Sequence, residues 1–105
     1  MPTHFNGLSD AETERLDMLA EECAEVIQAI SKIKRYGWES RHPDGGPTNR
    51  VQLFRELRDV AAVRWGMVIN GDLSDLCSED STDDLDLIAA RRWQNKLRFT
   101  HHQEP

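Results

Sequence analysis

Apolar residues recur every three or four positions through the first third of the chain, which is the period of one face of an α-helix. Ser9 and Glu12 fit a capping box, in which each side chain accepts a hydrogen bond from the other residue's backbone N–H at a helix start. Gly37 is a typical helix end. The pattern predicts a first helix over about residues 10–36. Its apolar stripe, expected to face packed protein, comprises Leu16, Leu19, Cys23, Val26, Ile27 and Ile30.

Turn-forming residues follow this helix. Residues 37–48 contain Pro43, the pair Gly45-Gly46 and Pro47, which predicts a connecting loop. Adjacent glycines can cradle a phosphate, but no Gly-Lys-Ser/Thr follows here, which excludes a P-loop. The expected role of the segment is that of a connector with tight turns.

Two further helices are expected after the loop. Thr48 suits the N-cap of a helix over about residues 49–70, which ends at Asn70-Gly71. Acidic residues between positions 72 and 86 precede a group of basic residues, an order that favours a third helix over about residues 82–98. No segment carries a strand pattern. The fold class is therefore all-α, with three main helices.

The second helix suggests that the chain self-associates. Its segment from Val60 to Ile69 is apolar on almost every side, and such a helix must be buried. Burial by another copy of the chain, or at the centre of a monomer, would satisfy this requirement. At 105 residues the chain corresponds to one domain, residues 1–105. We expect a helical bundle completed by homo-oligomerisation, as a homodimer or homotetramer.

Carboxylates occur in pairs on the first two helices. Glu22 and Glu25 share a strip of the first helix with Lys32, and Glu21 lies beside it. Glu56 and Asp59 begin an otherwise apolar face of the second. Both pairs should point toward packed protein, where an unpaired carboxylate costs roughly several kcal/mol unless it is neutralised, paired or bound to metal. We call each of these short acidic motifs an acidic phrase. A solvated acidic face with i,i+4 ion pairs explains one acidic phrase. Two such phrases on consecutive helices favour a divalent-metal site.

The type of ligand indicates the metal and its chemistry. Carboxylate oxygens suit hard cations, so Mg²⁺ is expected first and Mn²⁺ is a possible substitute. A di-iron carboxylate site requires Glu-x-x-His, whereas Glu25 and Asp59 stand at the histidine positions. Magnesium held by few protein ligands keeps positions for water and phosphate oxygens. Clustered acids therefore suit hydrolysis of a phosphoanhydride, with a carboxylate not bound to metal orienting the water.

Together these phrases resemble a known family. Glu21-Glu22-x-x-Glu25 followed by Glu56-x-x-Asp59 is similar to the signature of the MazG-like all-α nucleoside triphosphate pyrophosphohydrolases, over about residues 15–70. The phrases Arg35-Tyr-Gly, Pro47-Thr-Asn-Arg50 and Thr100-His-His-Gln103 resemble small members often encoded by bacteriophages. The stretch of roughly 30 residues between the two acidic phrases is long for the compact members, which leaves the role of the loop open.

The resemblance implies a reaction and a set of site residues. Water would attack the α-phosphate of an NTP or dNTP in a Mg²⁺-dependent reaction, giving the monophosphate and pyrophosphate. By motif position the metal ligands would be Glu22, Glu25, Glu56 and Asp59, and Glu21 would orient the water or share a metal. Cations near the acid strip, Lys32 first and then Arg35, are candidates to bind phosphate. Late basic residues in the family often approach the triphosphate, which adds Arg92 and Lys96, with Asn95 as a further polar contact.

Charge and cysteine content exclude several classes. Nineteen acidic against thirteen basic residues leave a net charge of −6, which argues against a polymeric nucleic-acid partner. No apolar run is long enough for a membrane span, and no signal-peptide pattern is present, so we expect a cytoplasmic protein without membrane contact. Cys23 and Cys77 are too few for a zinc cluster, and Cys23 is expected in the core. His101 and His102 fit a terminal tail, although the family resemblance leaves a place near the site open.

Three functional hypotheses follow. The first is a Mg²⁺-dependent nucleotide pyrophosphohydrolase acting on nucleotide pools. The second is a non-catalytic helical dimer that binds nucleotide or a protein partner and keeps the acids as a structural metal site. The third is a helical interaction module whose acids are merely solvated.

Overall fold

A computed structural model of the chain describes residues 5–73 and 85–103. In these residues the protein is all-helical, with α1 (Asp10–Tyr36), α2 (Asn49–Ile69), α3 (Leu85–Lys96) and a short 3₁₀ helix, η2 (Leu97–Phe99). No strand occurs in these ranges, and the only β-type pairing there is an isolated bridge between Arg41 and Thr48. The chain divides into two compact units, Met1–Asp72 and Leu73–Pro105.

The helix ends in the first unit follow the local signals in the sequence. Ser9 Oγ accepts from the Glu12 N–H at 3.1 Å and Glu12 Oε1 accepts from the Ser9 N–H at 3.0 Å, which completes the expected capping box. Gly37 ends α1 with a φ of 88°, a conformation that only glycine adopts without strain. Thr48 Oγ1 accepts from the Val51 N–H at 3.3 Å and caps α2. The predicted bounds of both helices are therefore confirmed to within one residue.

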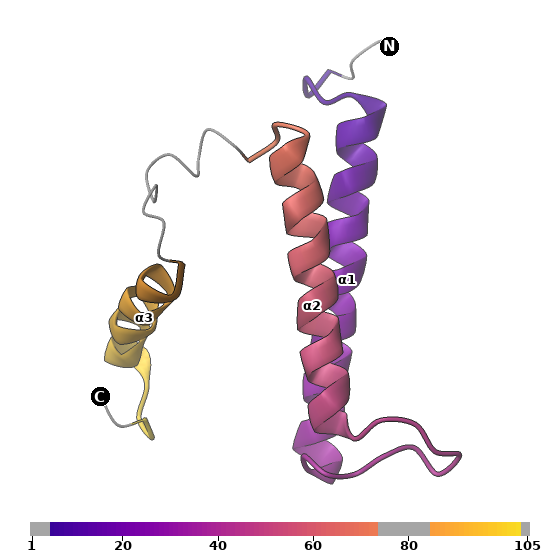
Figure 1. Cartoon of the computed structure of the whole chain (residues 1–105), viewed down its shortest axis with the longest axis vertical. Coiled ribbons are helices and arrows are strands. Elements are labelled where there is room, and N and C mark those ends of the chain that lie inside the picture. The colour runs from indigo at the N-terminus through magenta and orange to yellow at the C-terminus, as the bar shows by residue number, and fades with distance from the viewer. Residues whose placement is uncertain (1–4, 74–84, 104–105) are drawn as a thin grey trace. The chain divides into compact units, whose positions relative to one another are not determined.

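Helices α1 and α2 form an antiparallel hairpin and pack along their length (Figure 1). Buried and half-buried side chains recur every three or four residues on both helices, which is the spacing of a coiled-coil seam. This seam contains Arg15, Leu19, Glu22, Val26, Ala29 and Ile33 of α1, and Leu53, Glu56, Val60, Val63 and Met67 of α2. Two acidic residues therefore occupy positions that such a seam normally gives to apolar ones.

The apolar stripe expected to pack coincides only in part with the face of α1 that meets α2, because Leu19 and Val26 lie in the seam while the other stripe residues are exposed. Cys23, expected in the core, is exposed, and the exposed fraction of Ile27 is 67%. The helix carries apolar residues on two overlapping faces, and the centre of the seam lies about 70° around the axis from the centre of the expected stripe. Periodicity identified the helix but could not say which apolar face would meet α2, so the core assignment of Cys23 is wrong.

Burial of α2 on all sides is likewise not achieved within the hairpin. Met67 is buried, with an exposed fraction of 3%, but Trp65 and Ile69 are 65% and 60% exposed. Among the apolar residues whose side chains the structure describes, only Ala29 and Met67 are buried. One side of the apolar segment is covered by α1, and the other side is open.

An ion pair joins the start of α1 to the end of α2. Arg15 Nε lies 2.6 Å from Asp72 Oδ2, and Arg15 Nη2 donates to Asp72 Oδ1 at 3.0 Å, so the pair is bidentate. The hydrogen bonds from Arg15 lower the pKa of Asp72, against a smaller opposing effect of burial. Because the folded-state pKa lies below the ordinary value of 3.8, the pair stabilises the fold above that pH. This contribution is lost as the pH falls through the lowered pKa.

We expect Asp72→Asn to lower the melting temperature of the hairpin at pH 7 by a few degrees, because the amide loses the charge-assisted pair. The difference from wild type should shrink as the pH falls below 3.8 and through the lowered pKa of Asp72, where the carboxyl of the folded wild type also becomes protonated. Thermal unfolding followed by circular dichroism at pH 7 and pH 3 measures both effects. Asp17→Asn, at an exposed position of α1, is the control. An equal loss at both pH values would show that the carboxylate charge is irrelevant.

The third helix is shorter than expected where the structure describes it. It runs over Leu85–Lys96 and tightens into η2, which ends at Phe99, so the predicted end near residue 98 falls in the 3₁₀ turn. The predicted start at residues 82–84 lies outside the described residues. No helix within the described ranges has the length and apolar character needed to cross a membrane.

Candidate metal centre

The antiparallel hairpin brings the two acidic phrases together. Glu22 and Glu25 of α1 and Glu56 and Asp59 of α2 each offer a carboxylate oxygen, and these four oxygens all lie within 4.8 Å of one another. The helices place them there because each phrase has i,i+3 spacing, which puts both its acids on the side of the helix nearest the partner helix. We call these four residues the acid cluster.

Burial divides the acid cluster into inner and outer residues. Glu22 is half-buried and Glu56 is 91% buried, with an exposed fraction of 9%. Glu25 and Asp59 are exposed. The expectation that Glu22 would be partly buried is confirmed, whereas the expectation that both members of each pair would point into packed protein is wrong for Glu25 and Asp59. These two residues, at the rim of the seam, remain open to solvent.

Two oxygens in the acid cluster lack any hydrogen-bond partner. Oε2 of Glu22 and Oε2 of Glu56 are both buried and unpartnered. Within residues 5–73 no Lys or Arg side chain forms an ion pair with any of the four carboxylates. A buried, unsatisfied anionic oxygen is costly, because it has lost its water without gaining a donor or a cation. The set of ligands, all of them carboxylate oxygens, fits a hard divalent cation.

The protonation of Glu56 reflects the same lack of compensating charge. Burial raises its pKa above the ordinary value of 4.5, and the neighbouring carboxyl groups of Glu25 and Asp59 act in the same direction. The side-chain amide of Gln52 opposes this rise by donating to Glu56 Oε1. Gln52 thereby orients one oxygen of the carboxylate, and the other is buried without a hydrogen-bond partner.

The remaining predicted site residues are not among the four acids that converge. Glu21 is exposed and is not one of the four residues whose oxygens converge. Lys32 lines a pocket near the cluster, whereas Arg35 is not among the residues of that pocket. Arg92, Asn95 and Lys96 are exposed on α3, in the second compact unit. Their participation in the site stays a prediction.

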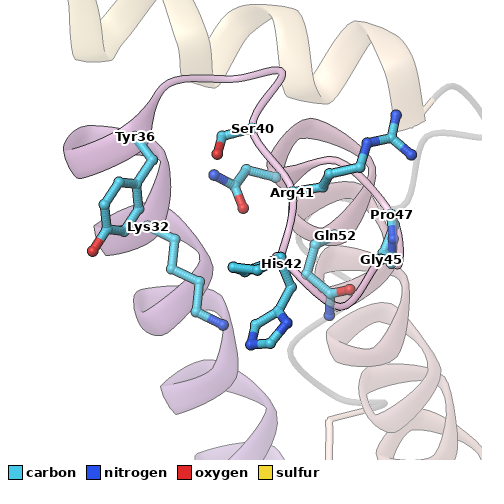
Figure 2. A pocket seen from close by; sticks show the side chains of 10 residues that line it. Lys32, Tyr36, Ser40, Arg41, His42, Gly45, Pro47 and Gln52 are labelled. Atoms are coloured by element: carbon cyan, nitrogen blue, oxygen red, sulfur yellow. The ribbon is translucent and has the colours of Figure 1, made fainter.

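Sequence reasoning missed a pocket formed by the loop. The pocket has a volume of about 470 Å³ and lies where the end of α1, the loop and the start of α2 meet (Figure 2). We call it the loop pocket; it is lined by Lys32, Tyr36, Ser40, Arg41, His42, Pro43, Gly45, Pro47, Asn49 and Gln52. A signal was present in the basic Arg41-His42 pair between two helices whose acids converge. Turn chemistry explains a connector equally well, so the pattern alone did not indicate a pocket.

Comparisons with family models, with curated proteins and with solved structures found no match to this chain. The MazG-like resemblance therefore stays a prediction carried by the two acidic phrases. The functional argument rests on the acid cluster and its surroundings.

Proposed function

We propose that the protein is a Mg²⁺-dependent nucleotide pyrophosphohydrolase that hydrolyses a nucleoside triphosphate at the α-phosphate to the monophosphate and pyrophosphate. The observation that carries the proposal is the pair of buried, unpartnered carboxylate oxygens on Glu22 and Glu56 within a cluster of four acids. Buried anionic oxygens without a partner are stabilised by a bound cation. A Mg²⁺ ion held by carboxylates keeps free coordination positions, which phosphate oxygens characteristically fill.

In this proposal the chain's own residues hold the metal and position the reactants. Glu22, Glu25, Glu56 and Asp59 bind Mg²⁺, or Mn²⁺ in its place, which neutralises phosphate charge and polarises the scissile bond. Gln52 fixes the orientation of the Glu56 carboxylate through its amide donor. Glu21, exposed beside Glu22, accepts a proton from the attacking water or orients it.

Cationic and polar side chains complete the substrate site in this account. Lys32 and Arg35 of α1 bind phosphate oxygens from the side of the loop. The family resemblance adds Arg92, Asn95 and Lys96 as candidates for further contacts to the triphosphate. Their charge offsets the repulsion between a triphosphate and a protein of net charge −6.

The proposal includes a homo-oligomer, a dimer or a tetramer, that completes the bundle. Its support is the large apolar area that the hairpin leaves open. Leu16, Cys23, Ile27 and Ile30 share one exposed face of α1, and Phe54, Trp65 and Ile69 are exposed on α2. Exposed apolar faces of this extent are typical of interfaces between subunits.

A second candidate function is a non-catalytic helical dimer with a structural metal site. It is favoured by the place of Glu22 and Glu56 in the seam, because a cation held there would join α1 to α2 and stabilise the hairpin. This candidate predicts that Mg²⁺ raises the melting temperature while no triphosphate is turned over.

A panel of canonical and modified NTPs and dNTPs, assayed with and without Mg²⁺, separates the two functions. We expect pyrophosphate and the nucleoside monophosphate as products from at least one substrate, with turnover dependent on metal. Orthophosphate as the sole product would rule out attack at the α-phosphate. Absence of turnover across the panel, together with stabilisation by Mg²⁺, would favour the structural metal site.

A further inference from the structure

The loop pocket carries charge of the opposite sign to the acid cluster. Lys32, Arg41 and His42 line it, and none of its lining residues is a carboxylate. The chain as a whole is acidic, with a net charge of −6, so a pocket lined by basic and no acidic residues differs in charge from the chain's average. Its local field therefore favours an anionic ligand.

Two of the three basic residues are directed into the space between the helices. Figure 2 shows the Lys32 ammonium and the His42 imidazole on the same side of the loop, whereas the Arg41 guanidinium turns away from both. Arg41 donates to the Gly46 carbonyl oxygen at 3.3 Å and so braces the loop. Lys32 forms no ion pair within residues 5–73.

The hydrogen bonding of His42 determines which ring nitrogen faces a ligand. The backbone N–H of Asp44 donates to His42 Nδ1 at 3.1 Å, and the Asp44 carboxylate lies 3.6 Å from the same nitrogen. Because Nδ1 accepts a hydrogen bond, the neutral ring carries its proton on Nε2. Nε2 is therefore available as a donor, with its orientation set by the loop backbone.

The loop pocket adjoins the acid cluster through one shared side chain. Gln52 lines the pocket and donates to Glu56 Oε1. On α1, Lys32 follows Glu25 by seven residues, a rise of about 10 Å. Its side chain leans toward the helix N-terminus, as helical side chains do, and so toward the cluster. A single extended ligand can contact both places.

We propose that the loop pocket binds the β- and γ-phosphates of the substrate, the part that leaves as pyrophosphate, through Lys32 Nζ and His42 Nε2. This assignment rests on the proposed function, because it takes the metal-bound phosphate at the acid cluster as the other end of the same ligand. Lys32 Nζ is a cationic donor and His42 Nε2 is an N–H donor, and no residue that lines the pocket is a carboxylate, although Asp44 lies beside the far nitrogen of His42. Such donors match a polyphosphate chain better than a neutral base. The nucleoside then extends from the cluster away from the loop.

Calorimetric binding of inorganic tripolyphosphate and of the common nucleoside monophosphates, in Mg²⁺, tests the assignment. Lys32→Ala and His42→Ala alter exposed side chains, and Lys34→Ala is the matched control on α1 outside the pocket. We expect each pocket variant to raise the Kd for tripolyphosphate about tenfold, as the loss of one charge-assisted contact does. The Kd values for monophosphates should stay within about twofold, and Lys34→Ala should match wild type.

The outcomes separate this assignment from the proposed function. Weaker monophosphate binding with unchanged tripolyphosphate binding would place the nucleoside in the pocket and overturn the assignment, as would variants that all match wild type. Wild-type protein that releases pyrophosphate but binds no tripolyphosphate would overturn the assignment alone. In a further outcome, the wild type binds tripolyphosphate but turns over no nucleotide. If the pocket variants then lose tripolyphosphate binding, this would support phosphate binding by the loop pocket and refute the proposed enzymatic activity.

Discussion

Glu56→Gln is expected to reduce pyrophosphate release at least about 1,000-fold while the fold is retained. Glu56 is the most buried acid of the cluster, its Oε2 has no hydrogen-bond partner, and one of its oxygens lies within 4.8 Å of oxygens of the other three acids. An amide keeps the shape of the carboxyl group, and its oxygen can still accept from Gln52, but it brings no negative charge to a metal. Steady-state assays at saturating Mg²⁺ measure the loss.

The same substitution should stabilise the protein in the absence of metal, which distinguishes loss of a ligand from loss of the fold. Removing the charge relieves both the burial of an unpaired carboxylate and its repulsion from Glu25 and Asp59. We expect a higher melting temperature than wild type in chelator, and no rise with Mg²⁺. Glu14→Gln, which removes an exposed acid of α1 outside the cluster, should leave both activity and Mg²⁺ response unchanged. A destabilised, inactive Glu56→Gln protein would contradict the account.

Ile27→Lys is expected to disrupt the proposed homo-oligomer. Ile27 is 67% exposed at the centre of the open apolar face of α1 and gains nothing from its position within one chain. Between copies it would be buried, contributing roughly 1.5 to 3 kcal/mol in each subunit, and a lysine there would have to bury its charge. Because a symmetric interface contains the residue twice, we expect the dissociation constant to rise at least about 100-fold.

Analytical ultracentrifugation across a concentration series measures that change. Gln28→Lys is the matched control, because it adds the same charge one position along α1 on the polar side of the helix. It should leave the oligomeric state as in wild type. A wild-type protein that is monomeric at all concentrations, or equal dissociation in both variants, would refute the interface on this face.

Local signals predicted the helices well because they depend on neighbouring residues alone. The capping box at Ser9, the positive φ of Gly37 and the Thr48 cap each involve contacts within a few residues, so the sequence pattern specifies them directly. The convergence of the acidic phrases was also predictable, because two consecutive helices joined by a short loop pack antiparallel. Identifying Glu22 and Glu56 required only that geometry and the i,i+3 spacing.

Features that depend on which helix faces meet were not predictable in the same way. Cys23 and Ile27 belong to the same expected apolar stripe as Val26, and only the packed hairpin shows that Val26 contacts α2 while the other two stay exposed. The loop pocket was not predictable from the sequence for a similar reason. It arises from a turn that brings His42 back over the helices, a conformation not specified by the composition of the loop.

The central claim is that the four carboxylates of the acid cluster hold a divalent cation, and Mn²⁺ titration followed by electron paramagnetic resonance tests it most directly. In wild type we predict bound Mn²⁺ that Mg²⁺ displaces, and in Glu56→Gln a loss of most of that binding. Wild-type protein that leaves the Mn²⁺ signal free in solution, or equal Mn²⁺ binding in Glu56→Gln, would contradict the claim.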